Sequence, residues 1–350
     1  MLLDSFGRTL NYLRISITDR CNLRCLYCMP PEGVEWKPHE NILTFEEIIR
    51  VVKIMSALGV CNVKVTGGEP LLRRGMPSFL KQLKNIDGIK RVTLTTNGVL
   101  LGAYLDEAEI MGEDALPDGI NISLDALDCE RYARITRFPR QSLQHAESNS
   151  GLNAPMQMIL PMIDRLLEKH VNVKINCVPV RTVNEEEILP ITSLAKDKNI
   201  IVRFIELMPF GSAHAYQPVS GAETAALIEK AFGVLTSING ITDNGITGNG
   251  PALYYSLPGF TGKIGFINAV SHGFCETCNR LRLTSEGFLK LCLSNDIGIS
   301  LREPLRSGVN DEELTRVITN IVKKKPAAHS LSKIYGTAET HPDGLSKIGG

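Results

Sequence analysis

The feature that most constrains the fold is an alternation of strand and helix patterns from about residue 12 to residue 208. Short, largely apolar segments predict strands over 12–18, 60–66, 91–96, 120–124, 171–180 and 200–207. Segments with a helical period separate them, over 44–58, 77–84, 100–111, 156–170 and 185–196. Six strands alternating with helices predict an α/β fold, in which a parallel sheet carries helices on its outside and is either open or curved into a partial barrel.

The most reactive residues follow the predicted strands where those strands end. Three cysteines lie within 21–28, a Gly-Gly-Glu-Pro turn occupies 67–70, and a Thr-Thr-Asn-Gly segment occupies 95–98. Ser123 and Asp125 end the fourth strand, and 206–208 ends the sixth. The carboxyl ends of parallel strands share one rim of the sheet, where α/β proteins place their chemistry. We therefore expect these segments to meet at one rim.

The charge balance excludes several classes of partner. Basic and acidic residues number 38 each, so the chain as a whole has no electrostatic reason to bind nucleic acid or a membrane surface. Any anion site must come from local clustering of basic residues. No apolar run reaches about 18 residues, so no membrane span is expected. Residues 1–8 resemble neither a secretory signal nor a transit peptide, and the compartment expected is the bacterial cytoplasm, or the mitochondrial matrix in a eukaryote.

The C-terminal part follows a different pattern. After about residue 211 the strand–helix rhythm stops; 239–250 is predicted to be a loop, 263–270 a strand, 280–293 a hairpin and 311–324 an amphipathic helix. Earlier in the chain, 138–155 resembles an insert with a polar centre at 141–153. We expect a partial barrel over 5–210, a second region over 211–330, and a flexible tail over 331–350.

The nine cysteines point to metal ligation. An odd number in a large chain without a signal segment argues against a disulfide scaffold. Cys21, Cys25 and Cys28 form a C-x3-C-x2-C group. Three thiolates on a four-iron cluster leave one iron open to another ligand. The alternatives are a zinc site, for which this spacing is poor, or buried free thiols.

A second group consists of Cys275, Cys278 and Cys292. The hairpin predicted over 280–293 turns at 285–287, so Cys292 is expected to return close to Cys278. The alternative is a zinc site that also uses His272. The remaining cysteines have no partner spacing and are interpreted as buried thiols: Cys61, Cys129 and Cys177.

Two arginines stand directly beside this second group. Arg280 and Arg282 alternate with Leu281 and Leu283, so on a strand the two guanidinium groups share a face. Such a pair suits phosphate, because guanidinium groups bind phosphate oxygens in a fork. The alternative is a pair of solvated charges on a strand surface.

With these residues described, a resemblance can be stated. The cysteine loop, including the aromatic Tyr27 before its third cysteine, resembles the signature of the radical S-adenosylmethionine (SAM) superfamily. The turn at 67–70 resembles the second signature of that superfamily. The resemblance implies a [4Fe–4S] cluster on Cys21, Cys25 and Cys28, whose open iron chelates the amino and carboxylate groups of SAM.

The whole chain resembles the molybdenum cofactor biosynthesis protein A family, the GTP 3′,8-cyclases. Five segments carry this resemblance, at 19–25, 94–98, 121–125, 203–208 and 274–282, together with the terminal Gly349 and Gly350. It implies an incomplete (βα)6 TIM-type barrel, with a C-terminal α+β extension that closes the open side. It also implies a second [4Fe–4S] cluster on the C-terminal cysteines.

The resemblance assigns further site residues by matching position. It implies that GTP contacts a set of basic and polar residues: Arg14, Lys64, Thr95, Lys174, Arg280, Leu281 and Arg282. It implies that SAM contacts a second set: Tyr27, Gly68, Ser123 and Met208. Arg203 joins Arg280 and Arg282 as a residue with an implied catalytic role.

The implied reaction converts GTP, with SAM, to (8S)-3′,8-cyclo-7,8-dihydroguanosine 5′-triphosphate, the first step of molybdenum cofactor (molybdopterin) biosynthesis. A 5′-deoxyadenosyl radical removes the ribose 3′-hydrogen, and C3′ then attacks C8 of guanine. The implied partners are an external electron donor, a second copy of the chain in a homodimer, and cyclic pyranopterin monophosphate synthase downstream. The alternatives are a radical SAM peptide- or protein-modifying enzyme with an auxiliary cluster, and a zinc-dependent binding module without catalysis.

Overall fold

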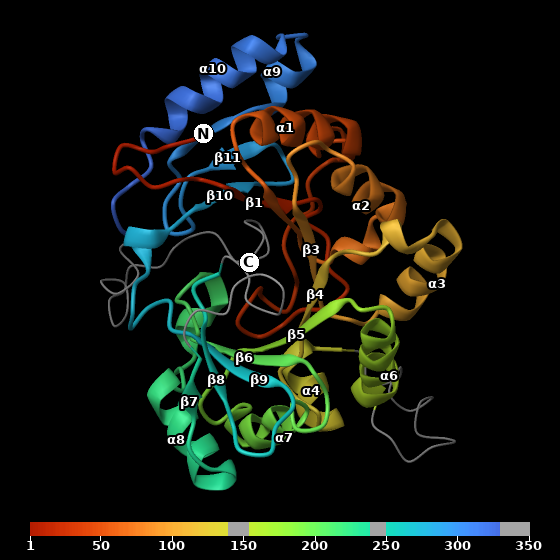
Figure 1. The fold of residues 1–350 in the computed structure, drawn as a ribbon, viewed down its shortest axis with the longest axis vertical. Helices are drawn as coiled ribbons and strands as arrows, with labels where there is room; N and C mark the ends of the chain where they lie inside the picture. Colours follow the sequence, from red (N-terminus) through yellow and green to blue (C-terminus); the bar gives the residue numbers. More distant parts are fainter. Residues whose placement is uncertain (139–153, 239–249, 330–350) are drawn as a thin grey trace.

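The computed structural model describes residues 1–138, 154–238 and 250–329. The predicted insert at 141–153, most of the predicted loop at 239–250, and the predicted tail with Gly349 and Gly350 lie outside these residues. The described strands form one twelve-stranded sheet in the order β12-β11-β10-β1-β2-β3-β4-β5-β6-β9-β8-β7 (Figure 1). The predicted α/β class with a parallel sheet is confirmed.

All of the strands predicted in the first part of the chain are present and pair in parallel with their sequence neighbours. Their bounds are β1 Tyr12–Ser16, β2 Asn62–Thr66, β3 Arg91–Thr96, β4 Gly119–Ser123, β5 Asn172–Cys177 and β6 Ile201–Ile205. Their alternating side chains explain the layering. Leu13 and Ile15 are fully buried in the core beneath the helices, whereas Arg14 between them belongs to the opposite, concave face.

The C-terminal strands lengthen the parallel sheet at both edges. β9 (Lys263–Ile267) pairs in parallel with β6, and β10 (Arg280–Leu283) pairs in parallel with β1. The outermost strands are antiparallel: β7 Thr236–Ser237, β8 Leu253–Ser256, β11 Phe288–Lys290 and β12 Gly298–Ser300. In the part of the chain that the structure describes, β12 and β7 do not pair, so the sheet remains an open, partial barrel.

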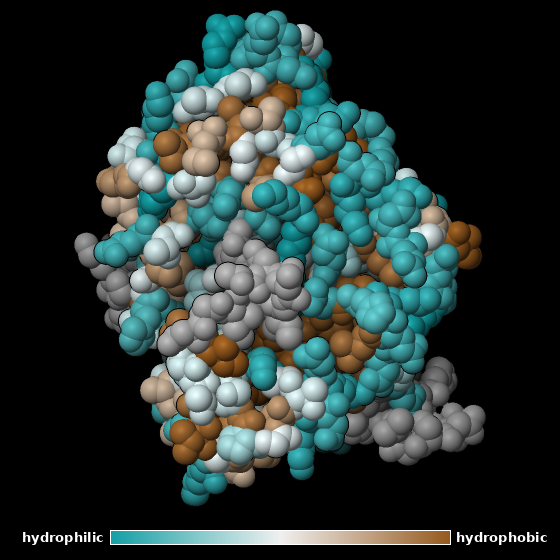
Figure 2. Space-filling view, viewed as in Figure 1, coloured by the Kyte–Doolittle hydropathy of each residue, from teal (hydrophilic) through white to brown (hydrophobic). Residues whose placement is uncertain are grey.

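Helices cover the convex side of this sheet, as Figure 1 shows for α1, α2, α3 and α6. Their bounds are α1 Phe45–Ala57, α2 Met76–Lys84, α3 Leu101–Met111, α4 Cys129–Thr136, α6 Ala154–Glu168, α7 Ile188–Ser193, α8 Gly221–Phe232, α9 Arg302–Arg306 and α10 Asp311–Val322. Hydrophilic residues cover most of the visible surface over α1, α2 and α3 in Figure 2. None of the helices in the described ranges is long and apolar enough to cross a bilayer.

The helix ends show where local sequence rules acted. α1 begins with a capping box in which the Thr44 hydroxyl accepts from Glu47 N–H and the Glu47 carboxylate accepts from Thr44 N–H. Pro190 does not break α7, because it lies in the first turn of that helix, where no N–H is needed. Sequence patterns missed α4 and α8 altogether.

Candidate active site

The loops after the first three strands meet at one rim, as predicted. The Glu69 carboxylate accepts hydrogen bonds from Asn97 N–H and from the Thr96 hydroxyl, both at 2.7 Å. The Asn97 side chain in turn donates to the Asn22 amide oxygen at 2.8 Å. The turn after β2 therefore connects β3 with the cysteine loop after β1.

The fourth loop joins the same rim through a buried carboxylate. Asp125 accepts from the Tyr27 hydroxyl and, at 2.8 Å, from Val178 N–H. Burial raises the pKa of Asp125 to about 6 and that of Glu69 to about 7, although the hydrogen bonds to each carboxylate oppose the shift. These carboxylates fix the geometry of the rim, and the hydroxyl hydrogen of Tyr27 is already donated to Asp125.

Cys21, Cys25 and Cys28 fit the iron–sulfur cluster that the resemblance implies. All three are partly buried thiols that form no disulfide, and they are near enough for Cys21 and Cys28 to act electrostatically on Cys25. Burial raises the pKa of the Cys21 and Cys25 thiols, so without metal they stay protonated. Cys21 Sγ already receives Leu23 N–H at 3.4 Å and the Asn97 amide at 3.9 Å, and such donors stabilise cluster sulfurs.

The unpredicted helix α4 holds the cysteine loop from behind. Arg24 N–H donates to Thr136 O, and Leu26 N–H donates to Ile135 O, each at 2.9 Å. The Arg137 guanidinium donates to Arg24 O at 3.1 Å. The loop is therefore anchored by its backbone, which leaves its thiols available for ligation.

The glycines of the second motif are required by a close approach. A Cβ atom on Gly68 would lie 2.2 Å from the carbonyl oxygen of Arg20. Gly68 N–H donates to Thr18 O, and Glu69 N–H donates to Arg20 O, both at 2.7 Å. Since the Gly68 N–H is already bonded, its carbonyl is the backbone group that remains for the SAM contact predicted at this position.

A cluster of cations lines the concave face of the sheet. Arg14 of β1 lies between its register partners Arg282 on β10 and Lys64 on β2. Burial and the neighbouring cations hold the pKa of Lys64 and Arg282 well below their usual values. Lys64 has no hydrogen bond or ion pair within the described residues. Lys64 is half-buried, and a cation withdrawn from water without a counter-charge is costly unless an anionic ligand completes the site.

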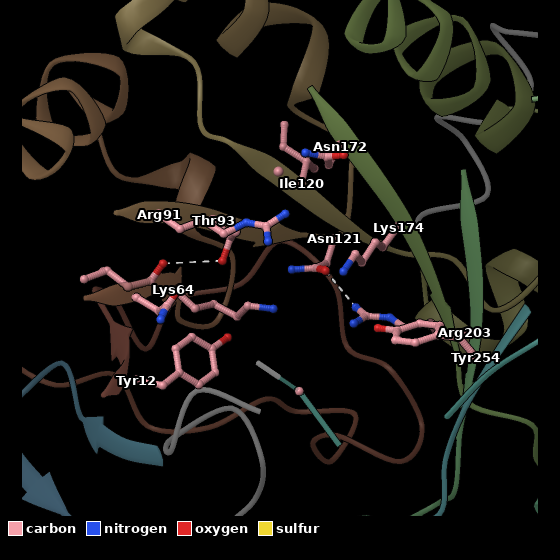
Figure 3. A pocket seen from close by; sticks show the side chains of 14 residues that line it. Tyr12, Lys64, Arg91, Thr93, Ile120, Asn121, Asn172, Lys174, Arg203 and Tyr254 are labelled. Atoms are coloured by element: carbon pink, nitrogen blue, oxygen red, sulfur yellow. Dashed lines mark hydrogen bonds between the residues drawn. The ribbon is translucent and has the colours of Figure 1, made fainter. Parts of the chain in front are cut away.

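A pocket with about 530 Å³ of empty space, part of it open to solvent, lies on this face; Lys64 lines it, whereas Arg14 and Arg282 do not. Figure 3 shows Lys64, Lys174 and Arg203 pointing into it from three different strands. Lys174 lies 5.8 Å from the ring centroid of Tyr254. No aspartate or glutamate is among the described residues that line the pocket, so the pocket favours a polyanion.

Arg203 is held by two asparagines. Its Nη2 donates to the amide oxygens of Asn121 at 2.7 Å and Asn176 at 2.6 Å. The Asn121 amide donates onward to the Thr95 hydroxyl at 3.2 Å. On β9, a Cβ atom on Gly265 would lie 3.0 Å from the Arg203 side chain, so the glycine leaves room for it.

The second cysteine group lies at the other end of β1 from the first. Tyr12 N–H, at the start of β1, donates to Asn279 O at 3.2 Å, and Cys278 directly precedes Asn279. The first group follows the end of β1. The five residues of β1 therefore separate the two groups by roughly 15 Å along the strand. The first residues of β1 to β5 are among those that line the cationic pocket.

The predicted hairpin brings the second group together. β10 and β11 pair antiparallel, and Cys278 and Cys292 are close enough to act electrostatically on Cys275. Cys275 Sγ receives His329 N–H at 3.3 Å. His272 of the zinc alternative is exposed, and its ring contacts Ser271. No three His, Cys, Asp or Glu side chains in the described ranges group closely enough to hold a single ion, whereas a four-iron cluster spreads its thiolates over several irons.

Arg280 and Arg282 share a face of β10, as the alternation predicted. Leu281 and Leu283 are buried in the core on the other face. The Arg280 guanidinium lies 4.5 Å from the ring centroid of Phe274. The side chain of Leu281 therefore points away from the pocket, and only its backbone is available to a ligand.

The remaining predicted SAM contacts stand at the rim. Ser123 ends β4 and is half-buried, and Met208 follows β6, where its carbonyl accepts from Phe210 N–H at 2.8 Å. Sequence reasoning assigned no role to the residues that hold these and the other site groups in place. Asn121 and Asp125 lie in the segment 121–125, which already carries part of the family resemblance, and each is two residues from Ser123, so the sequence did offer a signal for them. The sequence around Asn176 offered no such signal.

The partial barrel and the cysteine loop at its rim define a radical SAM enzyme, and residues 15–195 match the Radical SAM superfamily. A solved structure supports the fold: SuiB from Streptococcus suis bound to S-adenosylmethionine has a TM-score of 0.56 at 12% identity, covering 96% of this chain and 76% of that one. At such low identity the similarity shows the fold alone.

Residues 200–331 match the family Molybdenum Cofactor Synthesis C. The GTP 3′,8-cyclase of Clostridium perfringens (strain 13 / Type A) is 42% identical over 93% of this chain and 94% of its own length. The GTP 3′,8-cyclase of Heliobacterium modesticaldum is 39% identical over 100% of both chains. The chain belongs to the GTP 3′,8-cyclase family, and its cofactors are SAM and two [4Fe–4S] clusters.

Proposed function

We propose that this chain is a GTP 3′,8-cyclase, a radical SAM lyase that converts GTP to (8S)-3′,8-cyclo-7,8-dihydroguanosine 5′-triphosphate in the first step of molybdenum cofactor biosynthesis. The observation that carries the proposal is a cationic pocket on the concave face, with no acidic residue in its described lining, in a sheet whose strand β1 has a group of three cysteines beyond each of its ends. A triphosphate supplies the negative charge that this pocket lacks. The nucleoside can then extend toward either cysteine group.

Each end of the pocket has its own assignment. Cys21, Cys25 and Cys28 would hold the first cluster, beside a SAM site formed by Tyr27, Gly68, Ser123 and Met208. When bound, the reduced cluster and SAM supply a carbon-centred radical able to remove hydrogen from an unactivated C–H bond. Asp125 orients Tyr27, and Glu69 fixes the turn at Gly68. The other end would hold the second cluster: Cys275, Cys278 and Cys292.

The chain's own contribution is to bind and align GTP. We assign its contacts to the pocket cations and their neighbours: Arg14, Lys64, Thr95, Lys174, Arg280, Arg282 and the backbone of Leu281. Arg203, fixed by Asn121 and Asn176, is placed to direct its remaining guanidinium hydrogens at the nucleotide. Enclosure within the sheet excludes water and stray hydrogen donors, and it holds the ribose in position for abstraction at C3′.

The remaining assignments extend this proposal. We propose a homodimer, an external electron donor for the first cluster, and delivery of the product to cyclic pyranopterin monophosphate synthase. A reducing cytoplasm suits two groups of three cysteines that form no disulfide. A division at about residue 210 separates the radical SAM partial barrel, 5–210, from the region with the second cluster, 211–330.

The test is anaerobic reconstitution with iron and sulfide, followed by incubation with SAM, dithionite and GTP that carries deuterium at C3′. The proposal expects about eight irons per chain, deuterium in the 5′-deoxyadenosine formed, and a GTP-derived fluorescent pterin after oxidation. GTP with deuterium at C2′ is the matched control and transfers none. Turnover of SAM without deuterium transfer from C3′ would contradict the proposed reaction.

A further inference from the structure

A buried lysine near the second cysteine group has no role in the function proposed above. Lys325 follows α10 and is 3% exposed. Its Nζ donates to the carbonyl oxygen of Arg280 at 2.9 Å and to that of Leu291. Leu291 directly precedes Cys292, and Arg280 follows Cys278 by two residues. The ammonium group therefore ties together the start of β10, next to Cys278, and the segment after β11 that leads to Cys292.

Among the described residues, no carboxylate pairs with the ammonium group of Lys325. In the residues that the structure describes it forms no ion pair, and the charged groups nearest to it are Arg8, Arg280, Cys278 and Cys292. Both arginines repel it, and Arg8 is itself paired with Asp4 at 2.6 Å. Burying an ammonium group without an anion costs several kcal/mol. The two thiols, once deprotonated, are the anions within reach.

The segment that carries Lys325 is fixed against the same cysteines. Arg8 donates to Pro326 O at 2.6 Å and to Ala327 O at 2.9 Å, and it also donates to Cys275 O at 2.7 Å. His329 N–H donates to Cys275 Sγ. The ammonium group is thus held in one position relative to all three cysteines, which a flexible surface lysine could not achieve.

We propose that Lys325 is a positioning residue for the second cluster, whose ammonium group compensates the negative charge of the thiolate-bound cluster and holds its two ligand strands together. This inference rests on the proposed ligation by Cys275, Cys278 and Cys292. Three thiolates outweigh the positive charge of a four-iron core, and one-electron reduction adds a further negative charge. A fixed cation nearby stabilises the reduced form most, so it raises the reduction potential of that cluster.

The experiment measures the potentials of both clusters by EPR-monitored redox titration of the reconstituted full chain. Lys325→Gln keeps a hydrogen-bond donor for the carbonyls and removes the charge, whereas Lys325→Arg keeps the charge. Lys324→Met is the matched control, because Lys324 is exposed and directly precedes Lys325 in the sequence. The first cluster, at the other end of β1, serves as the internal reference for correct folding.

We expect Lys325→Gln to lower the potential of the second cluster, or to lose its irons selectively, while the first cluster is unchanged. Lys325→Arg and Lys324→Met should resemble wild type. An unchanged second cluster in Lys325→Gln, or equal damage to both clusters, would overturn the role of Lys325 alone. Wild-type protein with only about four irons would instead overturn the second-cluster ligation, and the inference with it.

Discussion

Replacement of Lys64 by methionine gives the sharpest test of the cationic pocket, because it predicts two effects of opposite sign. Met keeps an apolar stem and removes the charge. Lys64 is surrounded by Arg203, Arg14, Lys174 and Arg91, and its pKa is lowered well below the usual value by burial and by all four. Without GTP the charge of Lys64 lowers the stability of the folded protein, and with GTP the same charge binds the nucleotide.

The size of each effect follows from the structure. Arg14 and Lys64 are register partners on neighbouring strands, which lie about 4.8 Å apart. With their charges about 7 Å apart and an effective dielectric constant of about 20, they repel by about 2 kcal/mol. Loss of a charge-assisted hydrogen bond to phosphate costs about 1.5–3 kcal/mol. Lys64→Met should therefore raise the Tm of the GTP-free protein by about 3 °C and weaken GTP binding about 10- to 150-fold.

Two measurements on reconstituted protein check these effects: thermal unfolding without nucleotide, and titration calorimetry with GTP and, separately, with SAM. SAM affinity should be unchanged, because the proposed SAM contacts lie at the opposite end of the pocket. Lys90→Met is the control, since Lys90 is exposed; it should alter neither Tm nor Kd. A variant that is less stable without GTP yet binds GTP as tightly as wild type would refute the reasoning.

Two further predictions follow from the pocket and the rim. The pKa of Lys64 is lowered in the free protein, and GTP binding should raise it toward its usual value. Binding should therefore take up protons, and GTP affinity should fall as the pH rises from the pKa of Lys64 in the free protein to its pKa in the complex. Calorimetry in buffers of different ionisation enthalpy measures the proton uptake, which Lys64→Met should reduce. Gly68→Ala places a Cβ atom 2.2 Å from Arg20 O, so it should remove the first cluster and halve the iron content. The control is Gly102→Ala, whose Cβ atom meets only Met162 Sδ at 3.5 Å. This control should keep both clusters and gain up to about 1 kcal/mol of helix stability. Full iron in Gly68→Ala, or no proton uptake by wild type, would contradict these expectations.

The sequence alone determined the features that depend on neighbours a few residues away. The parallel strands, the capping box at Thr44 and the cysteine spacing at 21–28 were all readable, because periodicity and loop chemistry act over short distances. The alternation of Arg280 and Arg282 was equally local. α4 escaped detection because it is short, and the hydrogen bonds that join its last residues to the cysteine loop are backbone bonds, which leave no signal in the sequence.

Only the tertiary structure decided where the C-terminal strands pair. β10 could have extended either edge of the sheet, and its parallel pairing with β1 places the second cysteine group at the opposite end of the pocket from the first. The same pairing aligns Arg282 with Arg14 and Lys64, and it carries Lys325 to the cysteines. The choice of strand partner is made by side chains hundreds of residues apart in sequence, whose packing and charge no local pattern encodes.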